Sequence, residues 1–366
     1  MQLTMKSALY PRRRENDDAQ QRSSASGFSI VELMVALTIG GFIMLLLAGI
    51  FFTSSVTRKE SERVARQIEN GRYAMQLLSE DIKHAGYLAE FNPSVLTTPG
   101  TKPNACLTTV ADLNAALPVH IQGYDNGSGL TTECTALLTD RRTGTDVVVV
   151  RRTSTCVVGA AGCDAAVAGA PYFQASLCGS GTELASTTVT DYFVLDASTG
   201  TFGKHKKDCA ATAGLRRYLT HIYFITNNDV AGDGIPTLKR ADLGADVFTI
   251  VPLVEGVENL QMEYGVDTDN DGTPDTFTAD PDALTYTGCA TAPCVATWRN
   301  VMAVRINILA RNTEATIGYV DSKVYTLGKM ANGADNTFGP YSDSIKRHAY
   351  DGQVRINNAS ARRLVP

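Results

Sequence analysis

The chain has 366 residues, 44% of them apolar and 19% charged, a composition typical of folded proteins and not of disordered ones. Its formal net charge of −5 gives no electrostatic reason to expect nucleic acid as a partner, and a single Trp among 7% aromatic residues argues against a base-stacking platform. The length allows one large hydrophobic core or two modest ones.

Residues 28–52, FSIVELMVALTIGGFIMLLLAGIFF, form an apolar run with a single charged side chain, Glu32. About twenty apolar residues suffice to cross a bilayer as a helix. The run is too long for the core of a secretory signal peptide, and no A-x-A cleavage site follows it. We therefore predict a membrane-spanning helix over residues 28–52.

Basic residues outnumber acidic ones in the segment before this run. Because cytoplasmic flanks carry an excess of Lys and Arg, we predict a cytoplasmic N-terminus and an exported chain after Phe52, although Arg58 and Lys59 flank the other end. The segment contains Lys6, Arg12, Arg13, Arg14 and Arg22 against Glu15, Asp17 and Asp18.

An acidic residue inside a membrane span is costly and points to function, the alternative being a carboxyl that stays protonated or reaches the headgroups. The heptapeptide GFSIVEL at residues 27–33 closely resembles the class III signal of type IV prepilins. The resemblance implies that a prepilin peptidase cuts between Gly27 and Phe28 and N-methylates Phe28. Residues 1–27 are then a leader peptide, of 23 residues if translation starts at Met5, and Glu32 is the fifth residue of the mature chain.

Cleavage would create an α-amine on Phe28 that is largely protonated at neutral pH. A buried Glu32 needs a positive partner, and the Phe28 amine of a neighbouring subunit can supply one. Such a pair would also fix the axial register between two helices. The precursor lacks this amine, so we expect Glu32 to act in assembly only after processing.

The helix has no evident reason to stop at Phe52, since no proline occurs between Phe28 and Pro93. An apolar face continues at helical spacing, and Gly86 is a plausible C-cap. We predict one helix of about 87 Å over residues 28–85, with an amphipathic half at residues 53–86. The apolar face comprises Val64, Ile68, Met75, Leu78 and Ile82, and the solvated face carries Arg58, Lys59, Glu60, Glu62, Arg63, Arg66 and Glu69.

Strand-like runs recur along residues 87–366, so we predict that this segment is an exported β-rich head with large loops. Val304, Ile306 and Ile308 alternate with their neighbours, as in a strand with one buried face. The predicted fold class is α+β: a long N-terminal helix packed on an antiparallel sheet, as in type IV pilins. The strand-like runs are residues 147–150, 187–195, 215–225, 247–254, 260–264 and 301–310.

Several later blocks, at residues 218–225, 234–240, 253–267 and 298–301, resemble PilW-type minor pilins. The resemblance implies a low-abundance structural subunit that helps to prime a type IV pilus. Its partners would be the prepilin peptidase, other minor and major pilins and the inner membrane, with the head in the periplasm and later near the pilus tip. A minor pseudopilin of a type II secretion system is the alternative within the same superfamily.

The strongest local motif in the head is the acidic run DTDNDGTPD at residues 267–275. Carboxylates at positions one, three, five and nine, with glycine at six, match an EF-hand-like calcium loop. The candidate ligands are Asp267, Asp269, Asp271, Thr273 through its carbonyl, and Asp275. Thr278 stands where a bidentate Glu is expected, with Asp280 or Asp282 as substitutes; the alternative is an acidic turn without metal.

The eight cysteines all follow residue 100 and suit disulfides in an oxidising compartment better than scattered thiols. Short separations make Cys156–Cys163 and Cys289–Cys294 the easiest pairs to close. The other four could pair as Cys106–Cys134 and Cys178–Cys209, although eight cysteines allow 105 connectivities.

Common catalytic signatures, such as G-x-S-x-G, H-E-x-x-H and the P-loop, are absent from the sequence, so we expect no enzymatic activity. The histidines show no metal-ligand spacing, and His221 lies in a strand-like run as a core or edge residue. A membrane-anchored enzyme or calcium-dependent adhesin is the remaining alternative. An anchor alone has no use for Glu32 so close to a Gly-Phe junction.

Overall fold

The structure, a computed structural model, describes residues 27–363. The chain forms two compact units that meet between Arg58 and Lys59, and the helix α1 (Ile30–Lys83) belongs to both. Of the predicted leader peptide, only Gly27 lies within the described residues.

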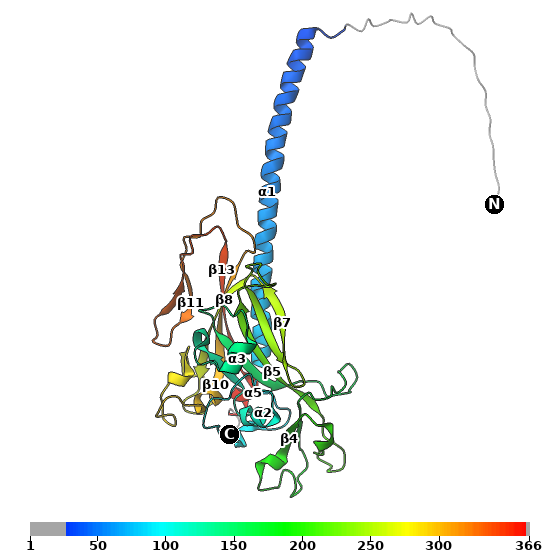
Figure 1. The fold of residues 1–366 in the computed structure, drawn as a ribbon, viewed down its shortest axis with the longest axis vertical. Coiled ribbons are helices and arrows are strands. Elements are labelled where there is room, and N and C mark those ends of the chain that lie inside the picture. Colours follow the sequence, from blue (N-terminus) through cyan, green and yellow to red (C-terminus); the bar gives the residue numbers. More distant parts are fainter. Residues whose placement is uncertain (1–26, 364–366) are drawn as a thin grey trace, which may run out of the picture. The chain divides into compact units, whose positions relative to one another are not determined.

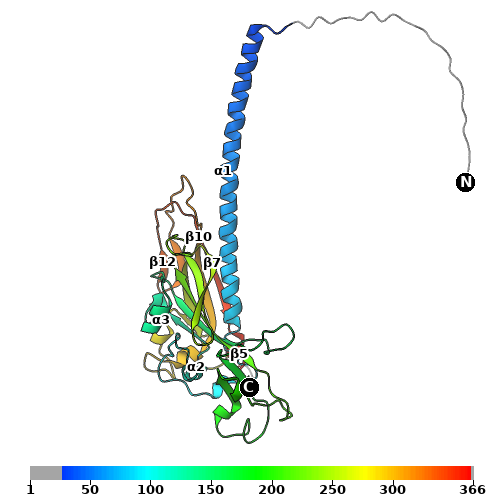
Figure 2. The same ribbon diagram turned by 45° about the vertical axis from the view of Figure 1, so that its right-hand side comes forward.

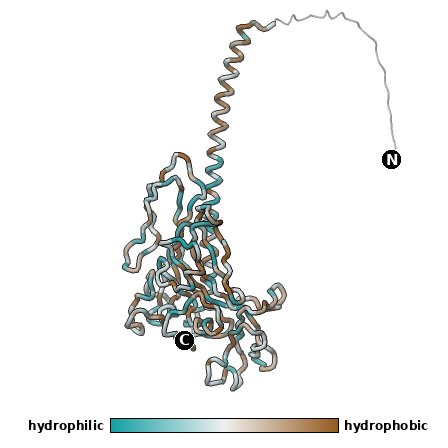
Figure 3. The backbone as a smooth tube through the Cα atoms, in the orientation of Figure 1, coloured by the Kyte–Doolittle hydropathy of each residue, from teal (hydrophilic) through white to brown (hydrophobic). Residues whose placement is uncertain are grey.

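In the first unit, the residues that the structure describes belong mainly to the apolar part of α1. Within the described residues, α1 is the helix long and apolar enough to cross a membrane. Figure 3 shows this part predominantly in brown, and apolar side chains such as Phe42 and Leu45 are about 70% exposed on it. Such a surface needs lipid or other helices around it, since an all-round apolar helix is not stable in water.

The second unit contains the rest of α1, which ends near Gly86 as predicted. Gly86 has a φ of +71°, and its N–H donates to the carbonyl of Arg151. The buried face of the helix differs from the predicted one, because Ile68 is exposed. It comprises Gln67, Gly71, Ala74, Leu78, Asp81 and Ile82.

Two antiparallel sheets and a hairpin form the head (Figure 1). The larger sheet has the order β1-β2-β5-β3-β4, with β6 between β5 and β7, and the second has the order β13-β10-β8-β9. The larger sheet comprises β1 (Ile121–Tyr124), β2 (Val147–Thr153), β3 (Tyr172–Ala175), β4 (Phe193–Asp196), β5 (Arg216–Thr226), β6 (Thr237–Leu243) and β7 (Phe248–Glu255). The second comprises β8 (Val257–Val266), β9 (Thr276–Thr278), β10 (Val301–Arg311) and β13 (Arg347–Arg355), and the hairpin joins β11 (Tyr325–Lys329) to β12 (Asp335–Phe338).

Short helices lie in the connections: α2 (Val110–Ala116), α3 (Thr132–Leu137), α4 (Ala296–Arg299) and α5 (Asn357–Ala361). Figure 2 shows the lower end of α1 beside the strands of the head. This arrangement confirms the predicted fold class, a long helix packed on antiparallel sheets.

One hydrophobic core joins α1 to both sheets. Val304, Ile306 and Ile308 of β10 share this core with Leu78 and Ile82 of α1, as the alternation in the sequence predicts. The opposite face of β10 is also covered, because Leu309 packs against Tyr325 and Leu327 of the hairpin. The second sheet is therefore buried on both sides at this point.

The strand predictions at β2, β5, β7, β8 and β10 agree with the structure, whereas residues 187–195 contain a 3₁₀ turn, Val189–Tyr192, and only the start of β4. The sequence did not reveal β13, whose residues RHAYDGQVR lack an apolar run. β13 lies at the edge of its sheet, pairs with β10 alone and needs no continuous apolar face. Long-range pairing therefore decides this strand, not local pattern.

Gly71 permits the close approach of α1 to β13. A Cβ atom at this position would lie 2.2 Å from Cε2 of Tyr350. A Gly-to-Ala change in an exposed helix stabilises by roughly 1 kcal/mol, but here overpacking opposes it by about 1–3 kcal/mol. We therefore expect Gly71→Ala to lower the denaturant midpoint of the full chain in detergent.

The control is the Gly71→Ala change made in a Tyr350→Ala background. Without the ring the same substitution should become neutral or stabilising, and this coupling separates the clash from a general helix effect. Equal effects in both backgrounds would contradict the close approach.

Candidate functional site

The N-terminal segment places the predicted processing residues at the start of α1. Phe28 is 85% exposed and precedes the first helical residue, Ile30. The backbone N–H of Ser29 donates to Oε2 of Glu32 at 3.1 Å, and the Ser29 hydroxyl accepts the N–H of Val31 at 3.2 Å. Ser29 and Glu32 thus form a capping box at the helix N-terminus.

This capping box adds a local role to Glu32 that the sequence analysis did not consider. The signal was present, since Ser-x-x-Glu before an apolar run is the sequence pattern of such a cap. A carboxylate in the first turn is also favoured by the helix dipole. Glu32 therefore has a hydrogen-bond partner within its own chain, in addition to any partner on a neighbouring subunit.

The acidic loop connects β8 to β9, so the sheet holds both of its ends. Val266 pairs with Thr276, and the N–H of Asp275 donates to the carbonyl of Val266 at 2.9 Å. Gly272 has a φ of +85°, which explains the glycine at the sixth position. The N–H of Gly272 donates to Oδ2 of Asp267 at 2.9 Å, which folds the loop around that carboxylate.

Three carboxylates in this loop come together. Asp267, Asp269 and Asp275 each offer an oxygen within 4.8 Å of the others, a set that could hold a metal ion. Asp271 and Thr273 are not in this group; the Asp271 carboxylate instead accepts the N–H of Thr273 at 2.7 Å. The structure thus brings together three of the five predicted ligand residues.

The proposed substitutes for the twelfth ligand lie elsewhere. Asp282 accepts from Lys102 and from the indole N–H of Trp298, both at 2.7 Å, and Asp280 caps the 3₁₀ turn that contains Asp282. No pattern in the sequence indicated a role for Arg363, whose guanidinium donates to Oδ2 of the buried Asp267 at 2.9 Å. A cation from this chain therefore already neutralises part of the acidic cluster.

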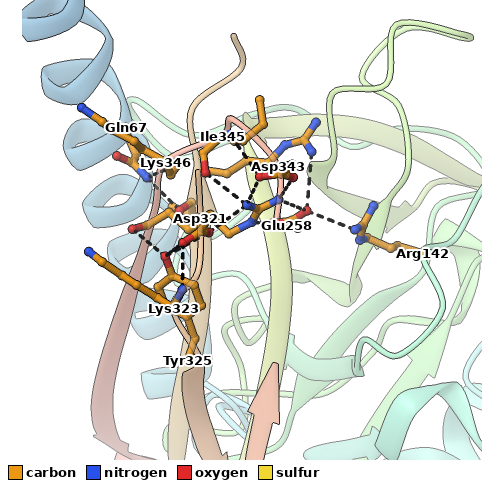
Figure 4. Close-up of polar contacts among 12 residues, drawn as sticks. Gln67, Arg142, Glu258, Asp321, Lys323, Tyr325, Asp343, Ile345 and Lys346 are labelled. Atoms are coloured by element: carbon orange, nitrogen blue, oxygen red, sulfur yellow. Dashed lines mark hydrogen bonds and ion pairs between the residues drawn. The ribbon is translucent and has the colours of Figure 1, made fainter. Parts of the chain in front are cut away.

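A buried ionic network joins β8, β13 and the two loops beside them. Arg347 donates to Glu258, to Asp321 at 2.9 Å and to Asp343 at 2.7 Å. Figure 4 shows the three carboxylates pointing towards one another. Burial would lower the pKa of the Arg347 guanidinium, but the hydrogen bonds and charges of its three partners raise it above its ordinary value.

A second polar cluster attaches the end of α1 to β5. Asp81 is 6% exposed and accepts from Arg152 at 2.6 Å and from the Tyr223 hydroxyl at 2.8 Å, while His221 lies 2.7 Å away. Burial would raise the pKa of Asp81, but the hydrogen bond with His221 and the charge of Arg152 hold it well below its usual range. His221 is thus a buried structural residue, as expected.

The loop between β10 and β11, residues 312–324, contacts α1 directly. The Thr316 hydroxyl donates to Glu60 at 3.1 Å, and Arg63 donates to the carbonyl of Ala315 at 3.4 Å and to Glu314. Lys346 also pairs with Glu60, at 2.6 Å. The prediction that Glu60 and Arg63 belong to a wholly solvated face was wrong, because this loop covers them.

All eight cysteines are paired in the structure. Cys156 is bonded to Cys163 and Cys289 to Cys294, and the other two disulfides are Cys106–Cys134 and Cys178–Cys209. These are the pairs that sequence separation favoured or allowed. Cys106 and Cys134 lie in the cluster that covers the outer face of the larger sheet, so this bridge fixes a long loop to that face.

Two regions of the chain match known protein families. Residues 222–358 match the family described as Type IV Pilus-assembly protein W, and residues 22–48 match the prokaryotic N-terminal methylation motif. The first region contains the Arg347 network and the acidic loop, and the second contains Gly27, Phe28 and Glu32. No curated protein matches the chain.

A solved structure, the type IV-like pilin TTHA1219 from Thermus thermophilus, is 12% identical and aligns over 59% of this chain and 78% of that one. The TM-score is 0.25, too low to bear on the fold.

Proposed function

We propose that this chain is a type IV pilus minor pilin of the PilW family with a structural role, and that it helps to initiate assembly of the pilus. The observation that carries the proposal is the presence of both matched regions in one chain: an N-terminal methylation motif on α1 and a PilW match in the head. The minor pseudopilin of a secretion system has no comparable support. The proposal would fail if deleting the chain left the number of pili per cell unchanged.

We propose that the leader stays in the cytoplasm, that α1 spans the inner membrane, and that the head faces the periplasm before incorporation near the pilus tip. The basic excess before Phe28 supports this orientation. The four disulfides support an oxidising compartment for the head.

Processing gives the first test of this function. We expect the chain recovered from sheared pili to begin at Phe28, to carry one N-methyl group and to lack residues 1–27. The reason is the exposed junction between Gly27 and Phe28, directly before the helix. Intact mass spectrometry of the native protein measures it, with a peptidase-deficient strain as the control. A leader still attached in assembled pili would contradict the proposal.

We propose that the acidic loop takes a calcium ion through Asp267, Asp269 and Asp275. Hard carboxylate oxygens suit Ca²⁺, and three of them converge here. Asp271 and Thr273 would join only after the loop rearranges, and Arg363 competes for Asp267. The expected affinity is therefore weak, at about 10⁻⁴ to 10⁻³ M, the range of extracellular modules.

Thermal melting of the full chain in detergent tests the site. A ligand that binds only the folded state stabilises it by about 2.7 kcal/mol at a hundredfold excess over Kd. We expect calcium to raise the Tm, Asp269→Ala to abolish the rise, and Arg363→Gln to strengthen binding by removing the competing cation. Asp335→Ala is the control, since that aspartate is 64% exposed and outside the loop. An equal rise of the Tm in Asp269→Ala and Asp335→Ala would show that the loop is an acidic turn without a calcium site.

A further inference from the structure

We propose that Arg151 holds a buried monovalent anion of the size of chloride, on the face of the larger sheet that points away from α1. The donors of this anion site are the guanidinium of Arg151 and the hydroxyl groups of Tyr218 and Thr220, on the neighbouring strands β2 and β5. The site lies within the second unit of the chain and does not depend on the proposed function.

The Arg151 guanidinium is buried without a counter-ion among the described residues. Arg151 is 3% exposed, and no carboxylate oxygen of residues 27–363 lies within 4.0 Å of its charged nitrogens. Its Nη1 donates to the carbonyl of Val119 at 3.2 Å, whereas the buried Nη2 has no partner in that range. A guanidinium stays protonated in proteins, and burying its charge unpaired is strongly unfavourable. Arg152, on the other face of β2, shows the usual solution, because it pairs with Asp81 at 2.6 Å.

Two hydroxyl groups on the same face of the sheet also lack partners. Thr220 lies directly opposite Arg151 in the pairing of β2 with β5, and Tyr218 lies opposite Thr153, two residues further along. Because paired residues share one face, and every second residue of a strand returns to it, these side chains gather on one face. Tyr218 and Thr220 are at most 1% exposed, and neither hydroxyl oxygen has a hydrogen-bond partner among the described residues. This face therefore carries three buried groups that can donate to an anion.

The electrostatic potential at this position is positive. Burial raises the pKa of Tyr218 to about 12, and the charge of Arg151 opposes this rise, so the guanidinium acts on that hydroxyl. Lys102 is a second cation nearby: burial lowers its pKa, and the charge of Arg151 lowers it further. In a buried setting of low dielectric constant, an anion at this point is attracted far more strongly than it would be in water.

The packing around the donors selects a small anion. Tyr218 shares an apolar cluster with Leu113 of α2 and with Leu117, which follows this helix. Val149, the next residue of β2 on this face, shares the adjoining cluster with Cys106. The chain between residues 105 and 117 thus covers the face and closes it to solvent. A monatomic anion suits a closed site with three donors, because a sulfate or phosphate would bring more oxygens and more charge than these donors satisfy.

An ordered water is the alternative occupant. Gln122 pairs with Val149, so its side chain lies on the same face. Its Nε2 donates to the hydroxyl of Tyr124 at 2.7 Å, but its buried Oε1 has no donor among the described residues. A water would satisfy this acceptor and the two hydroxyls, but it would leave the charge of Arg151 uncompensated. Charge therefore favours the anion, and a dependence of stability on chloride distinguishes the two occupants.

Thermal melting of the full chain in detergent tests the site, in sodium chloride and in sodium gluconate at equal ionic strength. Because a ligand that binds only the folded state stabilises it, we expect chloride to raise the Tm by about 2–4 °C relative to gluconate. Arg151→Met should remove this rise without lowering the Tm in gluconate, since an apolar side chain replaces a buried unpaired cation. Lys329→Met is the matched control, because it removes an exposed cation and should keep the rise.

Tyr218→Phe is the second variant, in case Arg151→Met does not fold, because it keeps the ring and removes one donor. Since the hydroxyl has no partner among the described residues, this variant should melt at the wild-type temperature in gluconate and below it in chloride. A Tm lowered equally in both salts would mean that the hydroxyl does not contact the anion. A wild-type Tm that is the same in both salts would leave water as the occupant and overturn the proposal. An equal chloride rise in the wild type and in Arg151→Met would overturn the assignment to Arg151.

Discussion

Replacing Glu32 by Gln should abolish incorporation of the chain into pili while leaving its membrane insertion intact. The substitution keeps a capping group for the Ser29 N–H, because Gln caps helices at this position as Glu does. It removes the negative charge that we expect to pair with the Phe28 amine of a neighbour. Breaking a buried charge pair costs about 3–5 kcal/mol, which is a factor of roughly 100 or more in an assembly equilibrium.

Glu32→Ala is the companion variant, because it removes both the charge and the cap. If charge pairing governs assembly, both variants should be missing from sheared pili and present in the membrane fraction, as immunoblots of the two fractions would show. Normal incorporation of Glu32→Gln together with loss of Glu32→Ala would mean that Glu32 acts as a helix cap only. Normal incorporation of both would exclude a role in assembly.

Replacing Arg347 by Met should destabilise the head more than any surface substitution. The change leaves the fully buried Asp321 without its cation, whereas Glu258 keeps Arg142 and Arg311 as partners. Removing one partner of a buried ion pair costs about 3–5 kcal/mol. The loss is measured as a lower denaturant midpoint of the full chain in detergent, followed by the fluorescence of the buried Trp298.

Two further variants show whether the cost comes from uncompensated charge. Adding Asp321→Asn to Arg347→Met should recover part of the loss, because an amide is less costly to bury than an unpaired carboxylate. Lys329→Met removes an exposed pair with Asp335 and should change stability by less than about 1 kcal/mol. A similar midpoint for Lys329→Met and Arg347→Met would mean that the network contributes little.

The buried network also holds the loop of residues 312–324 in place. Asp321 at one end of the loop is tied to Arg347, and Thr316 at the other is tied to Glu60 of α1. Loss of Arg347 should therefore release the segment that carries Ile317. Asp321 couples the network to the loop, so the stability of the head and the order of the loop are expected to change together.

Local patterns in the sequence were sufficient for the features that depend on neighbouring residues. The apolar run of 25 residues predicted the first part of α1, and the alternation around Ile306 predicted β10 with its buried face. Such patterns can be read directly because helix and strand periods are set by the backbone itself. The Ser29-x-x-Glu32 cap was equally local and could have been predicted.

Tertiary structure alone decided the contacts between distant segments. Arg347 meets Glu258 across 89 positions, and Arg363 meets Asp267 across 96. Neither contact has a sequence signature, because it depends on β13 and β8 both pairing with β10, and on the chain returning beside the acidic loop. The same holds for Ile68, which helical spacing placed on the buried face. Gly71 lies against Tyr350 where α1 meets β13, whereas Ile68 is 38% exposed.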